Sequence, residues 1–231
     1  MEALEPLDRE RLLAATSLIS LEFKRVLHQP GEPIDTVYFP ENAVVSLLTA
    51  MADGSTVEVA TIGNEGIVGI PLVLGVQAMA TRDYHQVQVG GSARAMDAAT
   101  FLKAARRNPL RNVVQRYTQA LFTQITQQVA CNAVHNVTER CARWMLLTHD
   151  RVGSDEFPMT QEFLATMLAV RRASVTVAAG TLQNAGLIRY SPGRVTIVDR
   201  KGLENAACEC YGVIRGEFER LFPPRPRRTA R

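Results

Sequence analysis

Cysteine and histidine are the side chains of this chain that are best suited to bind a metal ion or to act as nucleophiles. The 231-residue sequence contains four of each, at Cys131, Cys141, Cys208 and Cys210 and at His28, His85, His135 and His149. Their spacing is too wide for a zinc ribbon or a zinc finger, and a Cys-x-Cys pair is too tight for a relaxed disulfide. A chain of this length does not need disulfides to fold. We therefore expect reduced thiols, no metal site and no cofactor, and any cysteine chemistry to be regulatory and not structural.

Arginine is the other chemically informative residue type. The sequence has 26 Lys and Arg residues against 23 Asp and Glu residues, and a net charge of +3 is too small to indicate a nucleic-acid partner by itself. The basic residues are concentrated near the C-terminus, which predicts a basic tail over residues 213–231. Its arginines are Arg215, Arg220, Arg225, Arg227, Arg228 and Arg231.

Length and composition limit the class of protein. With 46% apolar residues, the chain can build one large domain or two small ones. The longest apolar run, residues 66–76, has about half the length that a membrane-spanning helix needs. The first residues are acidic, whereas a signal peptide begins with basic residues. We expect a soluble cytoplasmic protein without a membrane partner.

The first 95 residues carry the pattern of an all-β domain. Short β-prone runs alternate with turn residues, and residues 56–62 alternate with the period of two that a half-buried strand requires. Asp53-Gly54 lies between two such runs and predicts a hairpin. The pattern predicts an antiparallel β-roll.

The pattern then changes to that of helices. Residues 110–136 contain no Pro or Gly, and Asn108-Pro109 is a start signal, so one long helix is expected. A second helix should begin near Thr138 and end at Val152-Gly153. The apolar stripe on the long helix can pack on its own roll or against a second copy of the chain. The candidate dimerisation residues are Leu110, Val114, Tyr117, Leu121 and Ile125.

The segment 159–188 predicts two short helices joined by a tight turn. Thr160 can cap the first helix, and Gly186 can end the second. Two β-prone runs around residues 191–194 follow and predict a hairpin. A helix-turn-helix followed by a hairpin is a winged helix.

In this order of elements, the chain resembles the Crp/Fnr superfamily of bacterial transcription regulators. The resemblance implies an α+β protein with an N-terminal, jelly-roll-like antiparallel β-roll, a long central dimerisation helix and a C-terminal winged helix-turn-helix. The expected boundaries are 1–107 for an effector-sensing roll, 108–137 for the dimerisation helix, 138–212 for the winged helix and 213–231 for the basic tail. The implied function is that of a dimeric, sequence-specific regulator and not of an enzyme. The implied partners are a two-fold symmetric DNA operator and RNA polymerase.

The family register also implies which residues contact DNA. Arg172 matches an arginine that reads guanine, and methyl contacts to thymine replace polar contacts at Ala173 and Val177. The implied base-reading residues are Arg172, Ala173, Thr176 and Val177. Helix N-termini and the tip of the wing suit phosphate oxygens. The implied phosphate contacts are Thr160, Gln161, Arg171, Ser174 and Arg194.

The chain departs from the cyclic-AMP-binding members of the family. Where they read Gly-Glu-Leu-Gly, this chain has Gly66-Ile67-Val68-Gly69, and Ala78-Met79-Ala80-Thr81 replaces the region of their Arg-Ser. An aliphatic side chain cannot accept a bond from a ribose hydroxyl, so we expect an effector other than a cyclic nucleotide. Arg82 lies near enough in the sequence to supply a phosphate contact. The candidate effector pocket is Gly66, Ile67, Gly69, Arg82, Gln124 and Gln128.

The positions of the cysteines and histidines also bear on other cofactors and other functions. The iron–sulfur members carry an N-terminal group of cysteines, whereas no cysteine precedes Cys131 here. A haem ligand could come only from His85, and an ordinary surface or core histidine is favoured. A cupin-like metalloenzyme needs clustered ligands that His28 and His85 alone do not supply. The remaining alternative is a ligand-sensing or protein-interaction module whose winged helix does not read DNA.

Overall fold

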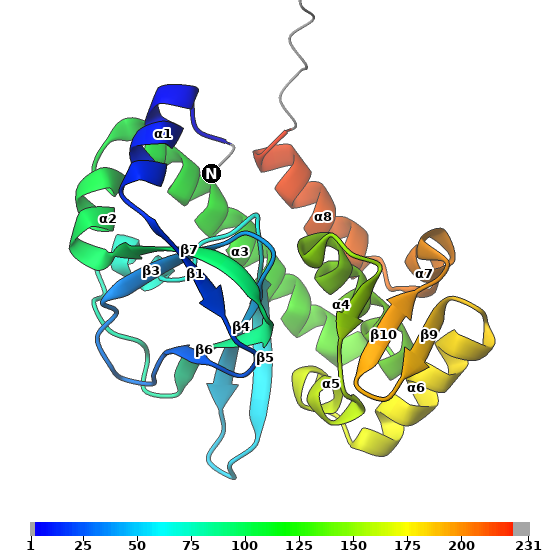
Figure 1. Cartoon of the computed structure of the whole chain (residues 1–231). Helices are drawn as coiled ribbons and strands as arrows, with labels where there is room; N and C mark the ends of the chain where they lie inside the picture. The colour runs from blue at the N-terminus through cyan, green and yellow to red at the C-terminus, as the bar shows by residue number, and fades with distance from the viewer. Residues whose placement is uncertain (1–2, 224–231) are drawn as a thin grey trace, which may run out of the picture.

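The computed structural model describes residues 3–223, in which one long helix joins a β-roll to a smaller body with a winged helix (Figure 1). The roll has two antiparallel sheets, one in the order β1-β7-β3 and one in the order β2-β6-β4-β5. This confirms the predicted fold class. The strands are β1 (Ser17–Leu21), β2 (Val26–His28), β3 (Thr36–Pro40), β4 (Val44–Ala50), β5 (Thr56–Ile62), β6 (Asp83–Val89) and β7 (Gly91–Asp97).

The predicted hairpin joins β4 to β5. Asp53 Oδ1 accepts hydrogen bonds from the backbone N–H and the hydroxyl of Ser55, at 2.9 and 2.7 Å. Gly54 has φ = 84°, a conformation that glycine adopts without steric cost. The turn sets the register in which Ala50 pairs with Thr56. Local turn chemistry therefore accounts for this part of the sheet.

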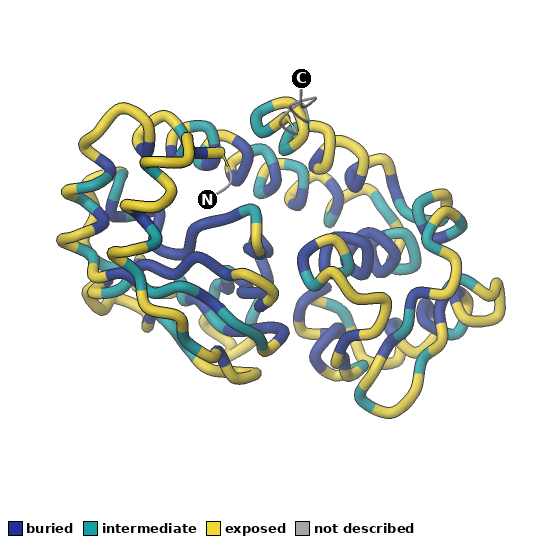
Figure 2. The backbone as a smooth tube through the Cα atoms, turned by 45° about the horizontal axis from the view of Figure 1, so that its top comes forward, coloured by how far each residue is buried: buried dark blue, intermediate teal, exposed yellow. Residues whose placement is uncertain are grey.

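Helices cover the open end of the roll and complete its core. They are α1 (Pro6–Ala14), the 3-10 helix η1 (Ile70–Leu74), α2 (Ala98–Ala105) and the 27-residue α3 (Asn108–Val134). The predicted long helix is thus confirmed. Buried positions line the inside of the roll, and exposed positions lie on the outer turns of the helices (Figure 2).

The apolar stripe on α3 packs on its own roll. Leu110, Val114, Tyr117 and Leu121 are buried in the roll core, and Ile125 is packed against it. Their own chain therefore covers four of the five predicted dimerisation residues and part of the fifth, Ile125, which leaves little of their surface for a dimer contact. The large apolar residues of α3 that stay exposed are Phe122, Val129 and Val134.

A two-residue hinge, His135 and Asn136, separates α3 from α4 (Val137–Val152). The N-cap of α4 is Asn136 and not the predicted Thr138. Asn136 Oδ1 accepts from the Glu139 N–H, and the Glu139 carboxylate accepts from the Asn136 N–H, both at 3.1 Å. This reciprocal pair is a capping box, which satisfies two backbone donors at once. Gly153 ends the helix with φ = 67°, as expected.

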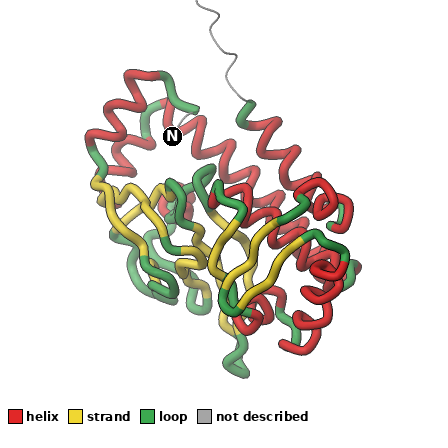
Figure 3. The backbone as a smooth tube through the Cα atoms, turned by 45° about the vertical axis from the view of Figure 1, so that its right-hand side comes forward, coloured by secondary structure: helices red, strands yellow, loops and turns green. Residues whose placement is uncertain are grey.

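The winged body combines helices with a small sheet, and its core includes the buried residues of α4 (Figure 3). Its sheet has the order β8-β10-β9, and its core continues from α4 through the two short helices. The elements are β8 (Glu156–Pro158), α5 (Gln161–Leu168), α6 (Arg172–Asn184), β9 (Ile188–Ser191), β10 (Arg194–Ile197) and α7 (Arg200–Ala206).

The first part of the predicted basic tail, residues 213–221, is helical. The last helix, α8 (Cys210–Leu221), runs beside α3, and Arg116 donates to the Leu221 carbonyl at 3.0 Å (Figure 1). Arg215 and Arg220 form ion pairs with glutamates of α7 and α8 instead of a free basic patch. Cys208 precedes α8 and does not lie in it. Arg225, Arg227, Arg228 and Arg231 lie outside the described residues.

No single helix within residues 3–223 is long and apolar enough to cross a membrane; by length and composition, only α5 and α6 taken together as a bent pair pass that test.

Buried polar residues join the roll to the winged body. Glu58 of β5 is 2% exposed and accepts from the Trp144 indole N–H of α4 at 2.9 Å. Ser46 has one hydroxyl proton for two neighbouring acceptors, Glu58 Oε2 at 2.5 Å and Gln88 Oε1 at 2.8 Å. Burial raises the pKa of Glu58 from 4.5 to about 6, although the hydrogen bonds that Ser46 and Trp144 donate to its carboxylate oppose the shift.

Replacing Glu58 with Gln should remove a pH-dependent loss of stability. Because the pKa is raised on folding, Glu58 contributes most below its ordinary pKa of 4.5, and this contribution is lost as the pH rises through about 6. The difference corresponds to about 2 kcal/mol. Urea unfolding measures the free energy of unfolding of the Glu58→Gln variant and of wild type. The value for the variant minus the value for wild type should therefore rise by about this amount between pH 4 and pH 7.5.

Glu32→Gln is the control, because Glu32 is exposed. Its free energy of unfolding relative to wild type should not change over the same pH range. A Glu58→Gln variant whose relative stability is the same at both pH values would contradict burial of a protonated carboxyl at this junction.

Candidate nucleic-acid interface

Helices α5 and α6 form the predicted helix-turn-helix, with an angle of 107° between them. Thr160 is the N-cap of α5, since its hydroxyl accepts from the Phe163 N–H at 3.1 Å. The turn contains Ala169 at φ = 52°, which is rare for a residue with a Cβ. The Val170 N–H donates to the Ala165 carbonyl at 3.0 Å and closes the turn. The cap predicted from the sequence is therefore confirmed.

The two faces of α6 have different surroundings. Val175, Ala178 and Leu182 are buried against α4 and α5, which fixes the rotation of the helix about its axis. The other face of its first two turns is open to solvent. The predicted base-reading residues Arg172, Ala173, Thr176 and Val177 all lie on this exposed face.

Two side chains on the exposed face already have partners from α5. Arg172 Nε lies 3.8 Å from the Glu162 carboxylate, although its side chain is 68% exposed. The Thr176 hydroxyl donates to Gln161 Oε1 at 2.8 Å. Glu162 was not among the predicted site residues. It follows Gln161 in the first turn of α5, and only the crossing of the two helices brings it to Arg172.

The predicted phosphate contacts gather at two helix starts and at the wing. Thr160 and Gln161 begin α5, and Arg171 is the N-cap residue of α6, with Ser174 in its first turn. Arg194 follows Gly193, whose φ is 80° in the wing turn. The wing and the start of α5 are adjacent, because the Met159 N–H donates to the Gly193 carbonyl at 2.8 Å.

Arg194 is held by a carboxylate of the neighbouring strand. Its Nη1 lies 2.7 Å from Glu156 Oε1 of β8, and its side chain remains 63% exposed. An exposed ion pair of this kind is worth about 0–1 kcal/mol, so a stronger anion can replace the carboxylate.

The structure does not bring the predicted effector residues together. Gly66 and Ile67 line a cavity of about 770 Å³ between the roll, α3 and α8. Arg82 is exposed at the opposite end of the sheet, since Asp83 pairs with Thr49 while Ile62, near Gly66, pairs with Val45.

The other effector candidates have structural roles. Gln124 donates to the Thr61 carbonyl at 3.0 Å and Gln128 to the Glu58 carbonyl at 3.4 Å, so both tie α3 to β5. Gly69, at φ = 124°, lies against Val37 of β3. A Cβ at Gly66 would come within 2.5 Å of the Tyr117 hydroxyl, so its place in the sequence is explained by close packing.

The two histidines of the roll are core residues. His28 Nδ1 and His85 Nδ1 lie 3.0 Å apart, and His28 Nε2 lies 2.7 Å from the Thr36 carbonyl oxygen. Burial lowers the pKa of His28, and burial together with the nearby His28 ring lowers that of His85 to about 3. Both rings are therefore neutral members of the roll interior at physiological pH.

Comparisons with known proteins agree with this architecture. The profile of the Crp-like helix-turn-helix domain matches residues 139–206. A search of curated proteins finds no match. Among solved structures, FixK2 from Bradyrhizobium japonicum has a TM-score of 0.68 at 16% identity, over 84% of this chain and 98% of that chain.

Two further structures share the fold. TTHB099, a CRP-family transcriptional regulator from Thermus thermophilus, has a TM-score of 0.67 at 20% identity, over 82% of this chain and 96% of that one. The c-di-GMP responsive global regulator CLP from Xanthomonas campestris has a TM-score of 0.63 at 15% identity, over 84% and 99%. Residues 139–206 are thus similar to a Crp-like helix-turn-helix domain, and the chain shares its fold with these solved regulators.

Proposed function

We propose that this protein is a transcription regulator and binds a two-fold symmetric DNA site as a homodimer, with α6 of each copy in the major groove. The observation that carries the proposal is the exposed first half of α6, which lies beside the start of α5 and the wing. A recognition helix inserts this part into the groove, while flanking elements meet the phosphates.

Arg172 is the main base-reading residue in this proposal. Its guanidinium is exposed and can bond O6 and N7 of guanine together once it leaves Glu162. Glu162 can then accept from the amino group of a cytosine. Ala173 and Val177 offer methyl groups to thymine, and Thr176 offers its hydroxyl after exchanging its bond to Gln161.

The remaining predicted residues bind the DNA backbone. Within residues 3–223, no side chain caps α6, so its first N–H groups are available to a phosphate oxygen. Arg171, Ser174, Thr160 and Gln161 surround these helix starts. Arg194 reaches the flanking phosphates from the wing. These contacts position the protein on any sequence.

The dimer seam is assigned to the solvent-exposed face of α3. Phe122 is 62% and Val129 is 63% exposed, and they lie seven residues apart. Exposed residues continue this line with steps of three and four, which is the spacing of a two-stranded coiled coil. The proposed seam is Gln115, Gln119, Phe122, Thr126, Val129 and Ala133.

This division of roles follows the two bodies and the helix between them. We propose that the roll senses an effector, that α3 forms the dimer up to Val134, and that the winged body binds DNA. Because the proposed operator is DNA, the protein would act in the cytoplasm. RNA polymerase is the further partner if the protein activates transcription.

We propose that the effector is not a cyclic nucleotide. Ile67 is 5% exposed and offers no acceptor to a ribose hydroxyl. Tyr117 packs on Gly66, and the exposed Arg82 lies at the other end of the sheet, where it cannot supply the phosphate contact.

Replacing Arg172 and replacing Arg194 should weaken DNA binding in different ways. Arg172→Ala should weaken binding to the preferred sequence by about 1–3 kcal/mol per half-site and leave binding to scrambled DNA almost unchanged. Arg194→Ala should weaken both, and should reduce the slope of log affinity against log salt by about two for a dimer. Salt titrations on selected and scrambled duplexes measure both effects.

Arg106→Ala, on the exposed surface of the roll, is the control and should change neither quantity. If Arg172→Ala weakens both duplexes equally, the base-reading role is wrong. If wild type shows no steep salt dependence on any duplex, the protein is an interaction module that does not read DNA.

Phe122→Glu should dissociate the dimer, because two carboxylates would meet at the centre of the seam. We expect the dimer Kd to rise by more than about tenfold, or ~1.4 kcal/mol. Sedimentation velocity measures the change. Leu74→Glu is the matched control, since Leu74 is 63% exposed but lies in η1 of the roll. A Phe122→Glu variant that sediments as wild type would move the seam to another surface.

Calorimetric titration with cyclic AMP and cyclic GMP should give no saturable heat at micromolar concentrations. The physical reason is the missing carboxylate at Ile67 together with the missing cation for the phosphate. AMP serves as the control for weak, non-specific heat. Saturable binding of either cyclic nucleotide in the micromolar range would overturn the assignment.

A further inference from the structure

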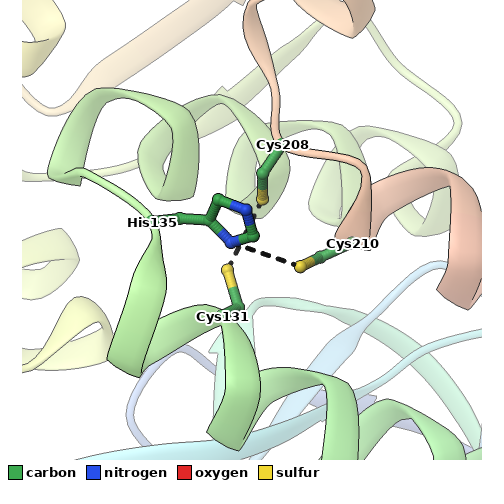
Figure 4. A group of neighbouring side chains, drawn as sticks. All are labelled: Cys131, His135, Cys208 and Cys210. Atoms are coloured by element: carbon green, nitrogen blue, oxygen red, sulfur yellow. Dashed lines mark hydrogen bonds between the residues drawn. The ribbon is translucent and has the colours of Figure 1, made fainter.

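Four metal-binding side chains that are far apart in the sequence meet beside the hinge (Figure 4). Cys131 lies in the last turn of α3 and His135 is the C-cap residue that follows it, whereas Cys208 precedes α8 and Cys210 is its first residue. One ligand atom of each residue lies within 4.8 Å of the other three. All three thiols are buried. The cluster is separate from the candidate nucleic-acid interface.

The distances fit a single tetrahedral ion. With metal–sulfur bonds of about 2.3 Å and metal–nitrogen bonds of about 2.0–2.1 Å, neighbouring ligand atoms lie about 3.6–3.8 Å apart. Cys131 Sγ lies 3.5 Å from Cys208 Sγ, and Cys210 Sγ lies 3.5 Å from His135 Nδ1. Three sulfurs and one imidazole nitrogen form a donor set that is common in structural zinc sites.

The surroundings of the cluster match those of a metal site. His135 Nε2 lies 3.1 Å from the Glu209 carboxylate, while Nδ1 faces Cys210. A metal-bound histidine commonly donates its second ring N–H to a carboxylate, which fixes the ring and its tautomer. The Gln127 side chain donates to Cys210 Sγ at 3.1 Å. Both bonds orient the ligands before an ion arrives.

Buried arginines supply the matching charge. Three thiolates and a divalent ion carry a net charge of −1, which needs a cation when it is buried. Arg143 is 1% exposed, and within residues 3–223 its Nε and Nη2 have no hydrogen-bond partner. Its charge helps to lower the pKa of Cys131, after the larger effect of the hydrogen bond from Cys208. Arg140 lies close enough for its charge to interact with Cys131 as well.

We propose that Cys131, His135, Cys208 and Cys210 bind one zinc ion. Binding releases the three thiol protons to solvent, and His135 binds through Nδ1. The ion ties the end of α3 to the start of α8, so that it would fix the hinge between the roll and the winged body. This site departs from the expectation of cysteines without a structural role. It does not depend on the protein's DNA contacts.

Metal analysis of the full chain, purified with a reductant, tests the proposal. Wild type should hold one zinc per chain. After removal of zinc, Co²⁺ should give the d–d absorption of a tetrahedral site together with a thiolate-to-cobalt charge-transfer band. Cys208→Ser should abolish the tetrahedral spectrum. Cys141→Ala is the control, because Cys141 is buried in the winged body away from the cluster, and it should keep both signals.

Glu209→Gln tests the site without disturbing the core, since the Glu209 side chain is 74% exposed. Competition with a chromophoric chelator should show zinc affinity lowered by about 10–100-fold, with the cobalt spectrum retained. Removing zinc from wild type should lower the thermal midpoint, and re-adding zinc should restore it.

Two results would overturn the proposal. One is wild-type protein, folded and reduced, that binds neither zinc nor cobalt at one ion per chain. The other is a folded Cys208→Ser variant with the wild-type stoichiometry and spectrum. A Cys131–Cys208 disulfide that forms in air in protein without metal affinity would assign the cluster to redox chemistry.

Discussion

Two glutamine side chains hold the roll on the long helix, and the arrangement of the two bodies depends on them. The amides of Gln124 and Gln128 donate to backbone carbonyls of β5, in a place from which water is excluded. Gln124 also accepts from Arg151 of α4 at 3.1 Å, and Arg151 pairs with Glu65 of the roll at 2.8 Å. Each of these polar groups is costly to bury alone, so the network is stable only when all three segments are in place. A side chain at Gly63 would overlap Arg151, which keeps this junction closed to larger residues.

The parts of the fold that depend on local chemistry are predictable from the sequence. Asp53-Gly54 makes its hairpin, Thr160 caps α5, and the uninterrupted run after Pro109 forms one helix. Periodicity shows that α3 has an apolar stripe, but it does not show which surface covers the stripe. Tyr117 and Leu121 are covered by the roll, whereas Phe122, one residue further, faces solvent. The N-cap at Asn136 was missed because Thr138 is an equally good capping residue by type. Only the capping box distinguishes them.

The candidate nucleic-acid interface and the cysteine cluster contain residues that meet only in the folded chain, and such contacts could not be predicted from the sequence. Arg172 and Thr176 were placed by the register of the family that the sequence resembles, and both lie on the exposed face of α6. The Glu162 partner of Arg172 comes from another helix and needs the crossing angle. Cys131 and Cys208 are separated by 76 residues of intervening chain, and no spacing rule covers ligands that meet only because α8 turns back along α3. In the free protein, Arg172 and Arg194 each form an ion pair with a carboxylate of the same chain. A DNA partner, as proposed, would have to displace these internal carboxylates.

The return of α8 along α3 has a mechanical consequence. The winged body leaves the rest of the molecule through two chain segments, the hinge at His135 and Asn136 and the segment 207–209 that leads into α8. Because α8 lies on α3, both segments are anchored to the same rod. The winged body is therefore connected to α3 at two places along the chain, in addition to the buried contacts of α4 with β5. Swivelling about the axis of α4 would require α8 to detach from α3. The orientation of the winged body is thus coupled to the packing of α8 on α3.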